Sequence, residues 1–168
     1  TKLNSLSAVS LSALNGSAIS AIPTAVLAAI TSDQISNLST AQISALSSLQ
    51  IQSLTTAQLN AMSADQIASI PASGVSALTA TQITGLTAAI DLLAGLSTTQ
   101  IPALSTANIA ILTGTQLNAL STTQINSLSA TQAKALTGTQ LTALTTENVG
   151  ALSTTAIANL STTAISTV

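Results

Sequence analysis

Large aliphatic residues recur at intervals of eight along almost the whole chain. The residue that opens each unit is Leu, Ile or Met from Leu6 to Leu86, and the spacing resumes at Leu96 after one ten-residue step. A second aliphatic residue, usually Ile or Leu, stands at the sixth position of most units. Repetition at a fixed period is typical of solenoids and other repeat arrays. The pattern predicts a single tandem-repeat solenoid over residues 1–168, with a ten-residue irregular repeat at 86–96.

The polar positions of the unit carry helix-start signals. Position two is Ser or Thr in most units, with Asn15, Pro23 and Pro71 as exceptions, and position five is commonly Gln. Ser or Thr followed three residues later by Gln is a capping box, in which hydroxyl and amide side chains each bond a backbone N–H. The aliphatic residues at positions one and six flank that box as a hydrophobic staple. The unit Leu-Ser/Thr-x-x-Gln-Ile-x-Ala therefore predicts a new helix every eight residues.

One continuous helix does not fit this spacing. Eight residues at about 100° each advance the helix face by about 80° per unit, so the aliphatic residues would spread around the cylinder. The chain should turn at each Leu-Ser/Thr step and form helices of roughly one and a half turns, which are unstable alone and must stack. We expect an all-α solenoid of very short capped helices, one per repeat, with each unit touching mainly its neighbours.

A β-solenoid is the alternative. Thr and Ile favour strands, and Gln and Thr side chains form ladders between stacked strands. Against it, positions one and six have opposite parity, so a flat strand would place them on opposite faces. One residue counts against the helical reading: Pro102 would occupy the fifth helical position and remove a hydrogen bond, so its unit must be 3₁₀-like or shorter.

Two features of the pattern leave alternatives open. The Gln column has a capping role and a second, compatible role as an amide ladder between stacked units. The irregular repeat, Thr87 to Gly95, carries three large aliphatic residues and no Gln. It is read as a longer helix that ends at Gly95, serving either as a neutral insertion or as a bend or lateral contact.

Composition excludes most chemistry. The chain has no Cys, His or aromatic residue, and only 4% of its residues are charged. These absences exclude disulfides, Cys or His metal ligands and His-dependent nucleophiles. Two lysines and no arginine leave too little positive charge for nucleic acid. The longest apolar run, Ala25 to Ile30, is far below the roughly 20 residues of a membrane helix.

The charged residues are too few and too scattered to form a site. They are Lys2, Asp33, Asp65, Asp91, Lys134 and Glu147. Asp33, Asp65 and Glu147 share position four, where the helix dipole stabilises a carboxylate. The residue types present allow one nucleophile–base pair, a Ser with Lys134, and we discount it. We expect no catalytic, cofactor-binding or metal site, no enzyme activity and no small-molecule ligand.

The ends of the array suggest self-association. The last unit, residues 161–168, resembles an interior unit, and neither end carries a charged cap. Solenoids normally need polar caps to stay monomeric. Either the chain is a window on a longer array, or copies join end to end in a heterologous contact that propagates as a homo-polymer. The first residues, Thr1 to Asn4, do not have the pattern of a secretory signal.

The octapeptide Leu-Ser/Thr-x-x-Gln-Ile-x-Ala resembles repeats of large secreted bacterial surface proteins of the adhesin and filament kind. The resemblance covers nearly the whole chain, carries no functional residues, and implies an extracellular or cell-surface location. The phrase Leu-Thr-x-x-Gln-Leu also looks like the DNA-reading repeats of plant-pathogen effectors, but those units are about four times longer and basic. The leading hypothesis is an extracellular structural protein that forms a filament, sheath or surface layer; an adhesin stalk and an ice-binding surface are the alternatives.

Overall fold

The structure is a computed structural model that describes residues 8–86 and 92–166. In these two ranges the chain forms short helices and no strand, so the fold is an all-α solenoid and the β-solenoid alternative is wrong. The helices, each three to six residues long, are α1 (Ala8–Ser12), α2 (Gly16–Ser20), α3 (Thr24–Leu27), α4 (Ser32–Ser36), α5 (Thr40–Ser44), α6 (Ser48–Ser53), α7 (Thr56–Asn60), α8 (Ala64–Ala68), α9 (Ala72–Ser76), α10 (Ala80–Thr84), α11 (Leu92–Gly95), η2 (Ile101–Ala103), α12 (Thr106–Ile111), α13 (Gly114–Ala119), α14 (Thr122–Asn126), α15 (Ala130–Ala135), α16 (Gly138–Ala143), α17 (Thr146–Ala151), α18 (Thr154–Asn159) and α19 (Thr162–Ile165).

Most helices start where the capping box predicts, whereas α3 and α9 follow a proline without a side-chain cap and η2 begins only after Gln100. Ser39 has extended backbone angles (φ −71°, ψ 160°), and its side chain accepts the N–H of Gln42. Leu54, the first residue of its unit, is also extended (φ −64°, ψ 140°). Positions one and two of a unit are thus both extended, and together they redirect the chain before the next helix begins. The helix of the Pro102 unit, η2, is a three-residue 3₁₀-helix, as the missing N–H of proline predicts.

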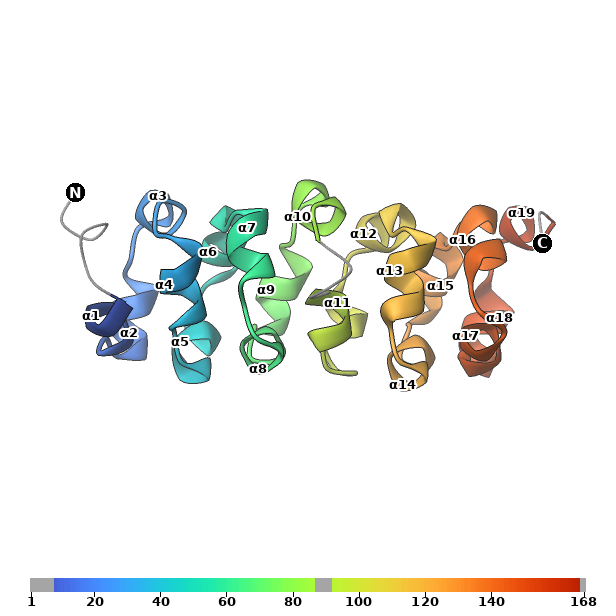
Figure 1. Cartoon of the computed structure of the whole chain (residues 1–168). Coiled ribbons are helices and arrows are strands. Elements are labelled where there is room, and N and C mark those ends of the chain that lie inside the picture. The colour runs from blue at the N-terminus through green and yellow to red at the C-terminus, as the bar shows by residue number, and fades with distance from the viewer. Residues whose placement is uncertain (1–7, 87–91, 167–168) are drawn as a thin grey trace.

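The units stack three to a turn. Helices pack most closely against those three units away along the chain, as α6 does against α9 and α15 against α18. A turn therefore holds three eight-residue units, one on each side, and successive turns lie side by side along a rod (Figure 1). The expectation that each unit would touch mainly the adjacent ones is corrected: the principal neighbour is a full turn away in the sequence.

The two aliphatic columns form the core. Except in the last turn, side chains at positions one and six face inward and join a single buried cluster along the described chain. Position six is the deeper of the two, since Ile35, Ile67 and Ile125 are at most 1% exposed. The pairing of these columns is what the eight-residue period predicts, and it needs no aromatic side chain.

The ten-residue repeat does not interrupt the stack. Residues 87–91 lie outside the described residues, so the prediction of a longer helix is tested only in its second half, where α11 runs from Leu92 to Gly95 and ends there. Both Leu92 and Leu93 are fully buried. A Cβ on Gly95 would lie 2.9 Å from Cγ2 of Ile67, so glycine allows this helix to approach the preceding turn closely.

Candidate functional site

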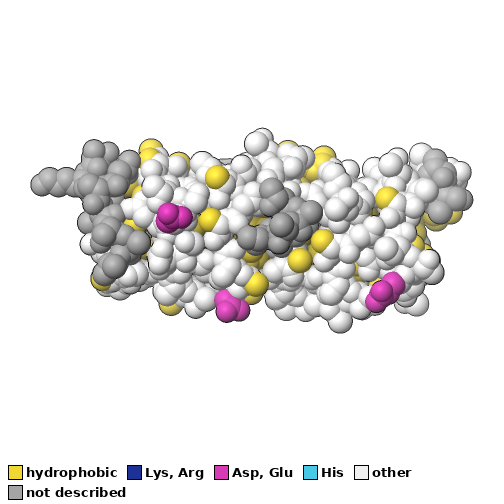
Figure 2. Space-filling view, in the orientation of Figure 1, with side chains coloured by type: hydrophobic (Ala, Val, Ile, Leu, Met, Phe, Trp, Pro, Cys, Tyr) yellow, Lys and Arg dark blue, Asp and Glu magenta, His cyan; other side chains and the backbone are white. Residues whose placement is uncertain are grey.

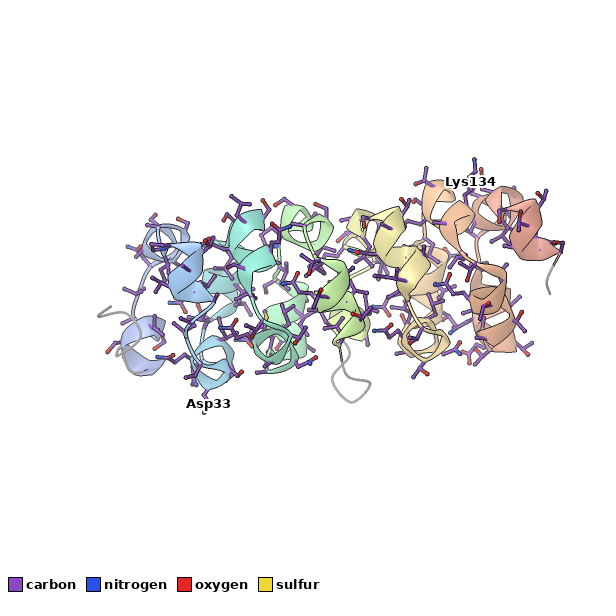
Figure 3. The ribbon with its side chains drawn as sticks, turned by 90° about the horizontal axis from the view of Figure 1, so that it is seen from above. Asp33 and Lys134 are labelled. Carbon is purple, nitrogen blue, oxygen red and sulfur yellow. The ribbon has the colours of Figure 1, made fainter. Side chains whose placement is uncertain are left out.

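The ionisable side chains do not converge. Asp33, Asp65 and Glu147 lie in the first turns of α4, α8 and α17, and Lys134 lies in the last turn of α15. Asp33 and Lys134 project from distant parts of the rod (Figure 3). Over residues 8–86 and 92–166 there is no group of three acidic side chains that could hold a metal ion. Lys2 and Asp91 lie outside the described residues.

The buried polar chemistry of the molecule is concentrated in the Gln column. Gln66 is 4% exposed, and its Oε1 accepts the N–H of Ser63 at 2.8 Å, which completes the capping box. Its Nε2 reaches the preceding turn, where it donates to the carbonyls of Leu38 at 2.7 Å and Ile35 at 3.1 Å. One side-chain amide therefore joins a corner of the solenoid to the same corner one turn earlier.

We call this arrangement the glutamine clamp. The Nε2 atom of each member donates to backbone carbonyls about thirty residues earlier in the chain; the members are Gln42, Gln50, Gln58, Gln66, Gln82, Gln100, Gln116, Gln124, Gln132 and Gln140. The sequence predicted the capping role of this column. Its predicted second role, a ladder between stacked units, takes a different form, because the acceptors are main-chain carbonyls instead of other glutamines.

The clamp also shows how the insertion is absorbed. Gln82 and Gln124 donate to carbonyls 31 and 28 residues earlier. For Gln100, whose preceding turn spans the ten-residue repeat, the corresponding separations are 33 and 30 residues. The amide still reaches the same corner, so the two extra residues are taken up locally. This favours the reading of the irregular repeat as a neutral insertion.

Three units that lack the clamp show a physical reason for it. Pro71 and Pro23 replace the Ser or Thr of the capping box, and proline has no N–H for a Gln Oε1 to accept. The fifth positions of these two units are Gly74 and Val26, not Gln. In the unit of Asn148 the shorter amide makes no capping box, and the N–H of Thr145 instead donates to Oδ1 of Asn118, one turn earlier, at 3.0 Å.

The C-terminal end of the rod differs from its interior. Position five is Ala156 and Ala164 in the last two helices, so no glutamine amide ties α18 and α19 to the turn before them. The sixth-position side chains there are exposed: Val149 by 45%, and Ile157 and Ile165 each by 51%. The equivalent side chains of interior turns are buried, since a following turn covers them.

These side chains form an apolar surface that we call the end face. It consists of Val149, Ile157 and Ile165 together with Leu141, Leu152 and Leu160, and all but Ile157 line a hollow of about 180 Å³. The sequence predicted an uncapped end, because the last units keep the aliphatic columns of the interior, but it did not show which side chains would be exposed there. The one signal available in the sequence was the loss of Gln at positions 156 and 164.

The sides of the rod offer little chemistry. Figure 2 shows a surface that is mostly neutral, with acidic side chains as isolated patches. Two lateral hollows are lined by small and hydroxyl-bearing residues such as Gly138, Thr139 and Thr142 in one and Thr122 and Thr123 in the other. Leu49 is the one large aliphatic side chain of the described regions that is more than 60% exposed. Among the helices described, none has the length and apolar character to cross a bilayer.

Comparison with known proteins supports the repeat architecture. The family model described as the ALTTAQ repeat matches residues 40–71 and 91–122. The chain is thus a tandem-repeat protein whose two matched segments lie within the clamp-bearing part of the rod. No curated protein and no solved structure matches the chain.

Proposed function

We propose that this chain is an extracellular, non-catalytic structural protein whose copies stack end to end into a filament, sheath or surface layer. The observation that carries the proposal is the end face. Val149, Ile157 and Ile165 are equivalent to side chains that are buried in the interior, yet no described residue covers them. Another solenoid turn is the surface that fits them best, because such a turn covers their counterparts throughout the rod.

Burial of the end face favours association, though each joint is weak. Complete burial of an Ile or Val side chain contributes about 1.5–3 kcal/mol, so covering side chains that are already half buried contributes about 1 kcal/mol each. Association also costs translational and rotational freedom. We therefore expect assembly to depend on concentration and to release single rods on dilution.

The surface composition supports assembly in a variable environment. With 4% charged residues and a formal net charge of −2, copies repel one another little. A joint made of aliphatic side chains does not weaken as salt screens charges, and kosmotropic salts strengthen it. The hydroxyl- and amide-bearing sides keep their character over a wide range of salt, which suits a protein outside the cell.

The test compares an end-face variant with a matched lateral variant. The double substitution Ile157→Asp with Ile165→Asp places two carboxylates on the end face, whereas Leu49→Asp places one on an exposed site on the side of the rod. Light scattering over a concentration series and negative-stain micrographs report assembly, and circular dichroism checks helicity. We expect wild type and Leu49→Asp to assemble and the double variant to remain monomeric. Monomers of wild type at every concentration, or equal loss in both variants, would overturn the proposal.

The rod shape supports one alternative, a spacer or adhesin stalk. Twenty units at three per turn and about 9 Å between packed helices give a rod of about 60 Å. A stalk needs length and no joint between copies. Single rods of that length, with no concentration dependence in light scattering, would favour the stalk.

A further inference from the structure

We propose that a hollow on the side of the rod, between α14 and α17, binds a neutral sugar unit of an oligosaccharide or polysaccharide. The hollow has a volume of about 320 Å³ and is lined by Thr122, Thr123, Asn126, Gly150 and Ala151. We call it the Gly150 hollow. Its two helices pack against each other in successive turns (Figure 1). Because it opens from the side of a single rod, the site does not rest on end-to-end assembly.

Gly150 keeps the hollow open, and packing does not require a glycine at this place. A Cβ built on Gly150 would meet no atom of another helix within 4 Å, and none of the described glycines has a positive φ. At Gly114, by contrast, a Cβ would overlap that of Ala143. Glycine in a helix costs about 1 kcal/mol relative to alanine. A residue that costs stability without a gain in packing is expected at a functional site.

The exposure of Gly150 follows from its position in the unit. Gly150 stands at position seven, which is exposed in interior turns as well, as at Ser44, Ala68 and Thr84. The helices of these three residues, α5, α8 and α10, each pack against a helix of the preceding turn and one of the following turn. A further turn stacked on α17 would therefore leave position seven open to the side.

The hollow holds an amide whose orientation is fixed and whose oxygen is free to accept. Nδ2 of Asn126 donates to the carbonyl of Ala151 in the next turn at 3.1 Å. The equivalent Asn118 makes the same kind of bond, to the carbonyl of Ala143, but its Oδ1 also accepts the N–H of Thr145. Among the described residues, none donates to Oδ1 of Asn126. This oxygen therefore remains as an acceptor that is already held in place.

The lining fits a ligand that is neutral and rich in hydroxyl groups. Oδ1 of Asn126 accepts from an O–H, and the hydroxyls of Thr122 and Thr123 both donate and accept. All five lining residues are uncharged, so the hollow lacks the groups that hold an anion or a metal ion. The neighbouring hydroxyls of a sugar ring supply donors and acceptors together. The expectation of no ligand was based on the lack of charged and nucleophilic groups, and a sugar needs neither.

The other lateral hollow is larger but lacks these groups. It has a volume of about 450 Å³ and includes Gly138, Thr139 and Thr142 in its lining, without an amide side chain. The hydroxyl of Thr142 donates to the carbonyl of Gly138 in its own helix at 2.8 Å. Because it offers hydroxyls but no fixed acceptor, this hollow serves as an internal control for the Gly150 hollow.

The test is a sugar titration followed residue by residue. Maltohexaose or cellohexaose, which are neutral chains of α- and β-linked glucose, is added to isotope-labelled wild-type protein and the amide signals are recorded by NMR. We expect at least one of the two sugars to give saturable shifts at Thr123, Asn126 and Gly150, with little change at Thr139 and Thr142. The absence of saturable shifts with both sugars, or equal shifts in the two hollows, would overturn the proposal.

A variant that fills the hollow separates binding from folding. Gly150→Leu adds a side chain where a Cβ meets no other helix, and leucine favours a helix over glycine, so we expect the melting temperature to be kept or raised. We expect its affinity for the sugar to fall at least about tenfold. Ala110→Leu makes a matched change at the exposed position seven of α12, outside the hollow, and should bind as wild type does. Undiminished binding by Gly150→Leu, or equal loss in both variants, would contradict the site. Light scattering tests assembly separately, so failure of the sugar site and failure of the proposed function are distinct results.

Discussion

The interior turns and the C-terminal turn are built from the same eight-residue unit, but different interactions hold them. In the interior, a buried amide such as that of Gln66 or Gln132 bonds to two successive turns. In α18 and α19 the same position is Ala156 and Ala164, so no glutamine amide at that position joins these helices to the preceding turn. The comparison teaches that the aliphatic columns build the rod while the amides fix its turns to one another.

The largest difference in stability between interior and C-terminal variants should appear at position six of the unit. Ile83 is completely buried in α10, whereas Ile157 is 51% exposed in α18. We expect Ile83→Ala to lower the free energy of unfolding by about 2–5 kcal/mol, because it leaves a cavity in the core. For Ile157→Ala we expect a loss below about 1 kcal/mol, because little buried surface disappears. Urea denaturation followed by circular dichroism measures both, and equal losses would contradict the assignment of the end face.

Removal of one clamp should have the next largest effect. Gln66→Ala leaves the N–H of Ser63 and the carbonyl of Leu38 without their buried partner, so we expect a loss of about 1–3 kcal/mol. Gln52 lies in α6 at position seven of its eight-residue unit, where it is exposed, and provides the matched control. Gln52→Ala should change the free energy of unfolding by less than about 0.5 kcal/mol. The same urea titration measures the free energy of unfolding of both variants. A similar loss in the two would show that the clamp does not stabilise the stack.

The two asparagines that replace a capping box allow a rescue experiment. Oδ1 of Asn118 accepts the N–H of Thr145 at 3.0 Å, and Nδ2 of Asn148 at 3.3 Å. We expect Asn118→Ala to cost about 1–2 kcal/mol, and we expect the addition of Asn148→Gln to recover most of it by restoring the capping box. A double-mutant cycle measures the coupling. Strictly additive effects would mean that the two sites act independently.

The smallest of these effects should come from adding a clamp to the last turn, which would stabilise that turn. In Ala164→Gln the new amide would lie one turn beyond Gln140, which donates to the carbonyls of Ile109 and Leu112 at 2.8 Å each. The equivalent acceptors for residue 164 are the carbonyls of Ala133 and Leu136. We expect a gain of about 1 kcal/mol, confined to α19. Amide hydrogen exchange should show slower exchange in that helix and no change in α7 or α8.

The sequence predicted the local structure well and the assembly of the turns poorly. The helix starts follow from the residues within one unit: Ser39 and Gln42 close a capping box whatever lies elsewhere. The burial of positions one and six follows equally from the eight-residue period. The number of units per turn does not, because it depends on contacts between residues about thirty positions apart, such as Gln66 with Leu38. The same limit kept the sequence from showing which side chains of the last described turns would be exposed, such as Ile157.

Because three units make one turn, the length of an insertion or deletion decides on which side of the rod all later residues lie. Gain or loss of one octapeptide turns everything beyond it by a third of a circle, which moves a lateral residue such as Leu49 to another side relative to later units. Gain or loss of three octapeptides leaves every later residue on its original side. The two extra residues near 86–96 alter neither the count nor the phase. Where selection preserves a pattern of residues on the sides of the rod, related chains should therefore differ in length by 24 residues. Where selection acts on length alone, they should differ by eight.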